Sequence, residues 1–560
     1  MQVTVYLLRA FCFFASFLFL PPVAAAPNID TLIINGQVHQ APDDTVVGVT
    51  RGKISYLGTL EKIQPLLGDT TQVIDLEGAA LYPGFIELHA HVFDNIMFSH
   101  RICPLQRLGN SLAIANCVAM AEQWPKERWV MGYSHGLLDT LPKNSHPRQW
   151  LDKHFPDRPV VVSEPHSLIA WLNTRALERL KVTRYSLDAK GGRVLRDSQH
   201  YPNGIVVGAI AEQALMEAVQ SHPMTFASSL TSMQEIQTAF HQQGITSLAE
   251  GGSLWQVGSI DFWLAVLDSG QLDVRVSVRP RLSPYRGVNE QLVQLKSILR
   301  NDFASSLIIN QVKISVDGQY HLGTARLNSP YLSPAIASEE KGLFYFSPTE
   351  LNTWLQRLQA LGYGAYLITE GDAAVEAAVY SIQNARRMSQ DQRFTLTDMH
   401  FVEPNVLQLI HKYDVSVNFT ELHDRRYLSR QMAKELPGSV SEKVTLASLS
   451  RHGISTALSS KGYNGGHQSP LAQISQSLQL GEHGFGSVSE AIDSYTIEPA
   501  RALGIEGITG SIVLGKSADF VVMERTLDEF AHEAIADAVI LMTLYQGKVV
   551  YEAEELKQSL

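Results

Sequence analysis

The middle of the chain alternates short apolar runs with longer stretches of helical periodicity, and this alternation is the strongest constraint on the fold. Apolar runs separated by helical segments are typical of parallel βα units. A (β/α)8 barrel needs eight such strands, and we therefore predict an α/β fold built on one. The predicted strands span residues 81–91, 244–250, 274–281, 308–317, 364–370, 398–403, 415–420 and 454–460.

Short β-type runs lie at both ends of the chain, between residues 30 and 80 and again after residue 510. Gly or Asn stops each of the early runs, as is typical of short strands joined by tight turns. We predict a small composite β-sandwich domain from residues 27–80 and 500–560, with the TIM-type barrel spanning 81–499. Residues 100–240 are too many for an ordinary βα connection, so we expect an inserted subdomain there.

The first 26 residues have the pattern of a secretory signal peptide. Arg9 is their only charge, an apolar run covers residues 10–20, and small residues follow at 24–26. The run is shorter than the roughly 20 residues that span a bilayer. We expect cleavage of residues 1–26, a soluble mature protein without membrane contact, and a secreted or periplasmic location. An uncleaved membrane anchor is the alternative.

The charge balance disfavours a nucleic-acid partner. The chain carries 45 Lys and Arg against 56 Asp and Glu, with a net charge of −11 and no basic run. We expect a small-molecule substrate as the partner. The three cysteines show no zinc-ligand spacing, and cleavage of the signal would leave Cys103 and Cys117. A single bridge and two buried thiols both remain open for this pair.

Polar residues close several of the predicted strands, at the end where barrel enzymes build their sites. His89 and His91 stand two residues apart, so both imidazoles lie on one strand face and can reach one cation. Because the chain contains 19 His in 560 residues, the pair alone is weak evidence. The closing residues are His89 and His91, Glu250, Lys313 and Asp317, Glu370 and Asp372, His400, and Ser460 and Lys461.

Longer segments resemble the metal-dependent amidohydrolases, in particular the family-3 branch. These segments follow the family's order along most of the chain. They are LYPGFIELHAH at 81–91, RPVVVSEPHSLIAWLNTRAL at 158–177, VKISVDG at 312–318, YTIEPARALG at 495–504 and GSIVLGKSADFVVM at 510–523. The resemblance implies a barrel with a split β-domain and metal-activated water that hydrolyses a C–N bond in a small molecule.

The resemblance also implies a set of site residues. His89 and His91 correspond to the first two metal ligands, Lys313 to a lysine that is carbamylated where it bridges metals, and His400 to a further histidine. His166 would face the substrate. Imidazole and carbamate oxygen suit one divalent cation, best Zn²⁺, whose bound water is a nucleophile at neutral pH.

Two family positions are filled differently. Ile368 stands where a histidine is expected, and Lys461 stands where an aspartate serves as ligand and general base. A protonated lysine cannot bind a cation, so one metal is expected rather than two. Glu370, two residues after Ile368, is the replacement candidate for the general base. A Glu370–Lys461 ion pair is the alternative, as is Lys461 acting as nucleophile or oxyanion stabiliser.

Two functions remain open from the sequence. The first is an exported hydrolase acting on non-peptide C–N bonds. The second is a degenerate homologue that binds a small molecule, holds no metal and catalyses nothing. The sequence leaves the substrate open, and a homo-oligomer is compatible with it.

Overall fold

A computed structural model describes residues 29–41, 45–64, 67–98, 102–104, 111–134, 146–163, 167–222, 226–252, 258–334, 336, 338–388, 391–420, 422, 442–460 and 469–554. The predicted signal segment, residues 1–26, lies outside the described residues. Within these residues, none of the helices combines the length and the apolar character needed to cross a membrane.

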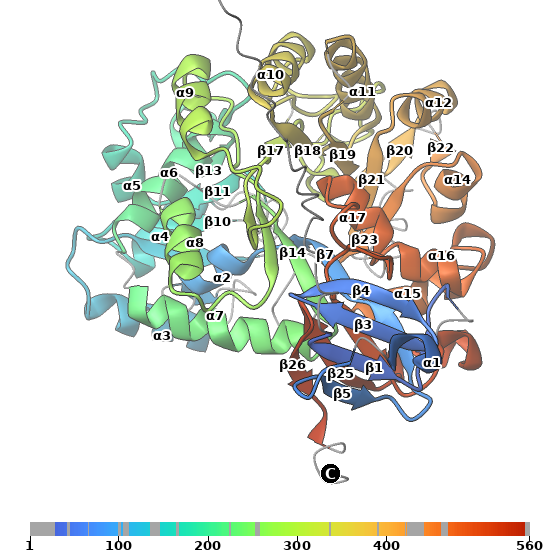
Figure 1. Cartoon of the computed structure of the whole chain (residues 1–560). Helices are drawn as coiled ribbons and strands as arrows, with labels where there is room; N and C mark the ends of the chain where they lie inside the picture. Colours follow the sequence, from blue (N-terminus) through green and yellow to red (C-terminus); the bar gives the residue numbers. More distant parts are fainter. Residues whose placement is uncertain are drawn as a thin grey trace, which may run out of the picture.

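Parallel strands form the centre of the molecule, in two ladders that follow the chain order (Figure 1). A parallel bridge between Arg281 and Lys313 joins the two ladders. The predicted α/β class is confirmed. The first ladder contains β7 (Phe85–Ala90), β14 (Ile245–Glu250), β15 (Arg275–Val278) and β16 (Leu307–Ile308). The second contains β17 (Gln311–Ser315), β18 (Gly364–Ile368), β19 (Phe394–Thr397), β21 (Ser416–Thr420) and β23 (Thr456–Ser459).

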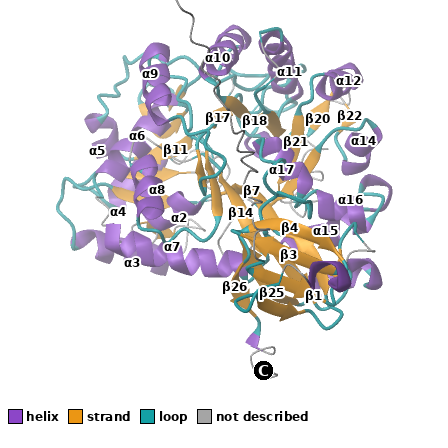
Figure 2. Cartoon of the chain, in the orientation of Figure 1, coloured by secondary structure: helices purple, strands orange, loops and turns teal. Residues whose placement is uncertain are grey.

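Helices follow most of these strands (Figure 2). The helix that precedes β18 shows how local sequence sets the start and end of a helix. Ser347 and Glu350 form a capping box, Pro348 occupies the first turn, and Gly362 ends the helix at φ +91°. The helices are α2 (Val92–Phe98), α7 (Phe226–His241), α8 (Ser259–Asp268), α9 (Val288–Ile298), α10 (Pro348–Leu361), α11 (Asp372–Arg386), α12 (Pro404–Lys412), α14 (Leu446–Arg451), α15 (Pro470–Gln479), α16 (Val488–Asp493) and α17 (Ile497–Leu503).

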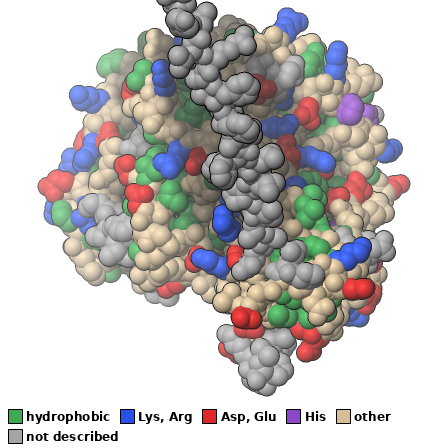
Figure 3. Space-filling model, viewed as in Figure 1, with side chains coloured by type: hydrophobic (Ala, Val, Ile, Leu, Met, Phe, Trp, Pro, Cys, Tyr) green, Lys and Arg blue, Asp and Glu red, His purple; other side chains and the backbone are tan. Residues whose placement is uncertain are grey.

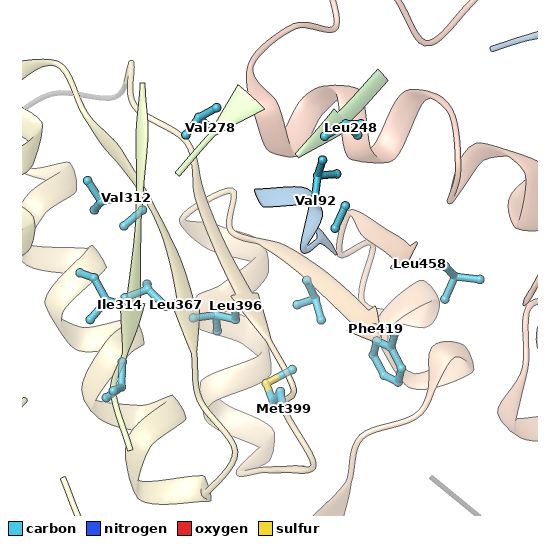
Figure 4. Close-up of a cluster of buried hydrophobic side chains, with 14 of the residues drawn as sticks. Val92, Leu248, Val278, Val312, Ile314, Leu367, Leu396, Met399, Phe419 and Leu458 are labelled. Atoms are coloured by element: carbon cyan, nitrogen blue, oxygen red, sulfur yellow. The ribbon is translucent and has the colours of Figure 1, made fainter. Parts of the chain in front are cut away.

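The strands bury apolar side chains on one face and polar ones on the other. Val312 and Ile314 of β17 join Leu367 of β18 in the main apolar cluster, part of which is drawn in Figure 4. Side chains alternate along a strand, so the intervening Lys313 and Ser315 point the opposite way. Both side chains line the pocket described below, so the alternation along β17 places polar groups in that pocket.

Strands from the two ends of the chain share one sheet, in the order β2-β6-β24-β25-β26. It packs against a second sheet, β4-β3-β1-β5, through apolar residues such as Val47, Leu81 and Phe520. The strands are β1 (Thr31–Ile34), β2 (Gln37–Val38), β3 (Val46–Thr50), β4 (Lys53–Gly58), β5 (Gln72–Asp75), β6 (Ala80–Pro83), β24 (Phe520–Met523), β25 (Ile540–Tyr545) and β26 (Lys548–Glu552).

Between β7 and β14 the chain builds a further sheet, in the order β12-β13-β11-β10-β9-β8. Cys103 on β8 and Cys117 on α3 are buried beside this sheet as free thiols. The elements are β8 (Ile102–Pro104), β9 (Val130–Tyr133), β10 (Val160–Ser163), β11 (Ile169–Leu172), β12 (Arg193–Arg196), β13 (Pro202–Val207), α3 (Ser111–Glu122), α4 (Pro147–His154), α5 (Thr174–Arg179) and α6 (Ala209–Gln220).

The sixth predicted strand, 398–403, was placed too late in the chain. The parallel strand at this position is β19 (Phe394–Thr397), and Asp398 ends it with a left-handed φ of +60°. The following β20 (Phe401–Val402) pairs antiparallel with β22 (Glu442–Lys443) outside the ladder. An Asp in this backbone region terminates a strand, and sequence periodicity does not reveal it.

A buried ion pair connects the parallel strands to the sheet that the two chain ends share. Arg275 at the start of β15 donates from Nη1 to Asp519 Oδ2 at 2.6 Å, and both side chains are buried. Asp519 also accepts hydrogen bonds from Thr509 and Ser517. Removing one partner of such a pair leaves an uncompensated buried charge.

We expect Asp519→Ala to lower the free energy of unfolding by about 3–5 kcal/mol, because Arg275 would then be buried without a counter-charge. Urea unfolding of the purified chain measures this. The exposed Arg286–Glu290 pair provides the control, since Glu290→Ala should cost less than about 1 kcal/mol. Equal losses in the two variants would contradict the assignment.

Candidate metal and active site

A pocket lies at the carboxyl ends of the parallel strands and comprises about 460 Å³ of empty space, open solvent included. Residues from β7, β17 and β18 line it, together with residues from the segments that follow β15, β17, β18 and β19 and from the segment that precedes β11. The lining residues are His89, Ser167, Leu168, Arg281, Lys313, Ser315, Asp317, Gly318, Gln319, Tyr345, Ile368, Glu370 and Asp398.

His89 lies in β7 and His91 directly follows this strand, with the two Nε2 atoms 3.1 Å apart. The other ring nitrogen of each is held from outside the pair: Nδ1 of His89 lies 2.8 Å from the Tyr366 hydroxyl, and Nδ1 of His91 lies 3.2 Å from Asp94 Oδ2. Partners on Nδ1 fix the ring orientation and direct both Nε2 atoms to one place. The pair therefore fits a shared metal ion.

Tyr366 is itself held by a buried polar network. Its oxygen accepts a hydrogen bond from Asn418 Nδ2 at 2.7 Å, and the Arg279 guanidinium lies 4.0 Å from its ring centroid. Asn418 also donates to Ser459 Oγ at 2.8 Å, at the end of β23. Burial raises the pKa of the Tyr366 phenol, which keeps it neutral beside His89.

Lys313 reaches the same pocket from β17. Gly252, two residues after the end of β14, has φ +101°, and a Cβ there would lie 2.1 Å from Lys313 Cδ. A Cβ at Gly251 would lie 2.4 Å from His89 Cδ2. Glycine at both positions therefore leaves the space that the Lys313 and His89 side chains occupy.

Glu370 and His400 meet in the structure. His400 Nε2 lies 3.8 Å from Glu370 Oε2, which also accepts a hydrogen bond from the backbone N–H of Tyr320. Glu370 lines the pocket together with His89 and Lys313, and so does the apolar Ile368. Two other predicted site residues, His166 and Lys461, lie outside the described residues.

Two carboxylates to which the sequence analysis assigned no role also lie in this region. Glu250 ends β14, and Asp94 lies in the first turn of α2, three residues after His91. One ligand atom from each of His91, Asp94 and Glu250 lies within 4.8 Å of the others. The position of Glu250 at a strand end was the available signal, whereas nothing in the sequence pointed to Asp94.

A third carboxylate, Glu87, connects the first and last parallel strands. Its oxygens accept hydrogen bonds from His89 N at 2.8 Å, from Ser460 N at 3.1 Å and from Ser460 Oγ at 2.8 Å. Burial raises the pKa of Glu87 to about 7. Ser460 follows β23, so these bonds join β23 to β7 directly beneath the histidine pair.

Together these features define an α/β protein whose imidazole and carboxylate side chains gather beside a pocket at one end of its parallel strands. The chain belongs to the amidohydrolase family, whose model matches residues 72–551. The family predicted from the sequence motifs is therefore confirmed.

Relatives cover nearly the whole chain at low identity. The chain is 22% identical to protein LONG AFTER FAR-RED 3 of Arabidopsis thaliana, over 93% of this chain and 91% of that protein. It is 21% identical to the N-substituted formamide deformylase of Arthrobacter pascens, over 93% and 98%. A crystal structure of an uncharacterized metal-dependent hydrolase from Pyrococcus horikoshii aligns with a TM-score of 0.65 at 18% identity, over 90% and 99%, which shows a common fold.

We expect Tyr366→Phe to weaken divalent-metal binding by about 10–100-fold, because His89 loses the partner on Nδ1 that orients its ring. Competition with a chromophoric chelator measures the affinity. Tyr363 is a matched control, since it is a buried tyrosine whose hydroxyl donates to Leu295 O away from the histidines. If Tyr363→Phe weakened binding equally, the effect would be a general one of packing.

Asp317 provides a prediction of pH dependence. It accepts hydrogen bonds from the backbone N–H groups of Arg326, Glu370 and Gly371, and burial raises its pKa to about 7. The folded state then keeps a proton that the unfolded state releases near pH 4, so the stability from this group is lost as pH rises towards 7. Unfolding free energies measured in urea with chelator should therefore fall less steeply between about pH 4 and pH 7 in Asp317→Asn. Parallel curves for wild type and variant would contradict this.

Proposed function

We propose that this protein is a metal-dependent hydrolase that cleaves a non-peptide C–N bond of a small molecule. The observation that carries the proposal is the His89–His91 pair, whose two Nε2 atoms lie 3.1 Å apart while Tyr366 and Asp94 hold the Nδ1 atoms. Family membership supports hydrolysis. The Arthrobacter pascens relative is named an N-substituted formamide deformylase, which supports an amide-type bond.

The finer fold assignment belongs to the same proposal. We infer a closed (β/α)8 barrel with a β-sandwich domain built from both chain ends. The Arg281–Lys313 bridge between the ladders and the Glu87–Ser460 hydrogen bonds between β7 and β23 support closure. The apolar cluster shared by the two end sheets supports the sandwich.

In this proposal one divalent ion, best Zn²⁺, is held by His89, His91, carbamylated Lys313 and His400. Imidazole nitrogen and carbamate oxygen are suitable Zn²⁺ ligands. When bound, such an ion supplies a water whose pKa is lowered to about 7. This set of ligands is supported by the pocket, which both Lys313 and His89 line.

The remaining roles fall to residues of this chain. Glu370 lines the pocket, takes up the proton of the attacking water and then passes it to the leaving nitrogen. His400, 3.8 Å away, orients this carboxylate. We assign His166 to substrate contact and Lys461 to stabilising negative charge on the substrate oxygen. Export after removal of residues 1–26 is part of the proposal.

One observation favours a second candidate function, a small-molecule binding protein without catalysis. Ile368, which pairs with Ser315 in the ladder, is an apolar residue that lines the pocket together with Lys313 and Glu370. An apolar residue there serves ligand contact and offers nothing to a metal. Metal content and turnover distinguish the two functions.

We expect wild-type protein, purified without a metal-affinity tag, to hold about one divalent metal per chain and to hydrolyse members of an amide and urea panel. His89→Ala should lose the metal, and its kcat/KM should fall at least about 100-fold. The reason is that removing even a residue that only holds a metal ligand in place lowers metal affinity or activity 10–100-fold. Elemental analysis and product chromatography measure both.

The control is His241→Ala, which removes another buried histidine, one that contacts Asp273 O instead of the pocket. This variant should keep metal and activity. Wild-type protein that holds no metal, turns over no amide and still binds ligands would establish the binding function instead.

A further inference from the structure

We propose that Cys103 and Cys117 form a disulfide bond that ties α3 to β8, the edge strand of the sheet β12-β13-β11-β10-β9-β8, called the inserted sheet below. Both residues are thiols in the structure, so the bond is a modification made after the chain is synthesised. A bond at this place goes beyond the proposed function, because it involves neither the metal nor the hydrolysis. It also decides between the bridge and the two buried thiols that the sequence leaves open.

The two sulfur atoms lie in one buried place. Cys103 on β8 is fully buried and Cys117 on α3 is 2% exposed, and both belong to one apolar cluster with Ile114, Val130 and Trp171. The two thiols also form a hydrogen bond with each other, so the side chains are in contact. A disulfide requires the two Cβ atoms to lie about 4 Å apart, and thiols that already touch are close to that arrangement.

The surroundings argue against other uses of this thiol pair. Structural Zn²⁺ sites take four ligands, and no His, Asp or Glu of the described chain joins the two cysteines in a group that could hold a metal. A nucleophilic cysteine needs a neighbouring base or cation that stabilises its thiolate. The hydrogen bond to Cys117 and burial instead raise the pKa of the Cys103 thiol, and no charged side chain of the described residues lowers it.

The edge strand gains stability from such a bond. β8 is three residues long and pairs on one side, with β9 through residues 102–104. Pro104, the last of these residues, has no N–H group to give to the ladder. A cross-link from Cys103 to Cys117 restricts the unfolded chain and thereby stabilises the folded one.

The inserted sheet also reaches the pocket. β8 pairs with β9 and β9 pairs with β10. Ser167 and Leu168 lie between β10 and β11, and both line the pocket. The disulfide therefore fixes the outer edge of the sheet that supplies one wall of the pocket.

The bond needs an oxidant, and a small-molecule or protein disulfide is the class that provides it. One cysteine thiolate attacks this disulfide and displaces one of its sulfurs as a thiol, and the other cysteine then displaces the second. Each cysteine loses a proton, and the pair passes two electrons to the oxidant, which leaves as two thiols. Because both sulfurs are buried in the folded protein, the exchange precedes the packing of α3 on the inserted sheet. Oxidising compartments hold such oxidants.

The test compares the full chain made in cells with an oxidising cytoplasm and in cells with a reducing one, so it requires neither export nor refolding. Free thiols are alkylated in urea, and the chain is digested with trypsin without reduction. The three cysteines fall in different tryptic peptides, 10–51, 102–107 and 108–126. We expect mass spectrometry to find 102–107 linked to 108–126 in most chains from the oxidising cells and in none from the reducing cells.

The matched control is the third cysteine of the chain. Cys103→Ser and Cys117→Ser should each abolish the linked peptides, whereas Cys12→Ser should leave them unchanged. Far-UV circular dichroism shows that each protein is folded. Folded wild-type chain from the oxidising cells in which both peptides are alkylated, or in which the link involves peptide 10–51, overturns the proposal whether or not the variants fold.

A second measurement tests the position of the link. Dithiothreitol should open it at least about tenfold more slowly in the folded chain than in urea, because access limits thiol–disulfide exchange. Equal rates would contradict a bond buried between β8 and α3. Hydrolysis of the amide and urea panel is measured on the same samples. A linked chain without turnover supports the disulfide and counts against the proposed function alone, and turnover in a chain without the link does the reverse.

Discussion

The structure depends on a group of buried polar contacts where the first and last parallel strands meet. Glu87 bonds to the backbone of His89 and to Ser460, and Tyr366 bonds to His89 and Asn418 one layer further on. Parallel strands buried on both faces have few places for polar groups, so each such group must find its partner across the strands. The contact between Tyr366 and Nδ1 of His89 also orients the His89 ring.

Much of the fold follows from the sequence because the apolar runs are long and regular. The runs predicted at 244–250 and 364–370 correspond closely to β14 and β18. The strand predicted at 398–403 was wrong because Asp398 adopts φ +60° and the ladder strand ends before it. Mixed charges on the surface, seen on one face in Figure 3, accord with the composition but say nothing about topology.

The candidate site was predictable where a residue closes a strand. His89, Lys313 and Glu370 were found in this way, and the structure brings all three to one pocket. Asp94 and Tyr366 could not be found, because their importance lies in contacts with residues on β7 that no local pattern encodes. Glu250 closes a strand as well, yet only its distance to His91 and Asp94 gives it a role.

The buried carboxylates of this region differ in how completely the chain satisfies them. Glu87 has both oxygens bonded to Ser460 or His89, and Asp317 accepts three backbone N–H groups. Glu250 is bonded through Oε2 alone, although it is equally buried and faces a second carboxylate. Burial in a low-dielectric interior penalises each of these charges. A further hydrogen bond or counter-charge would therefore stabilise Glu250 more than Glu87 or Asp317, because one oxygen of Glu250 is unbonded. The unbonded oxygen of Glu250 therefore marks the place in this region where the chain's own hydrogen bonds satisfy a buried carboxylate least.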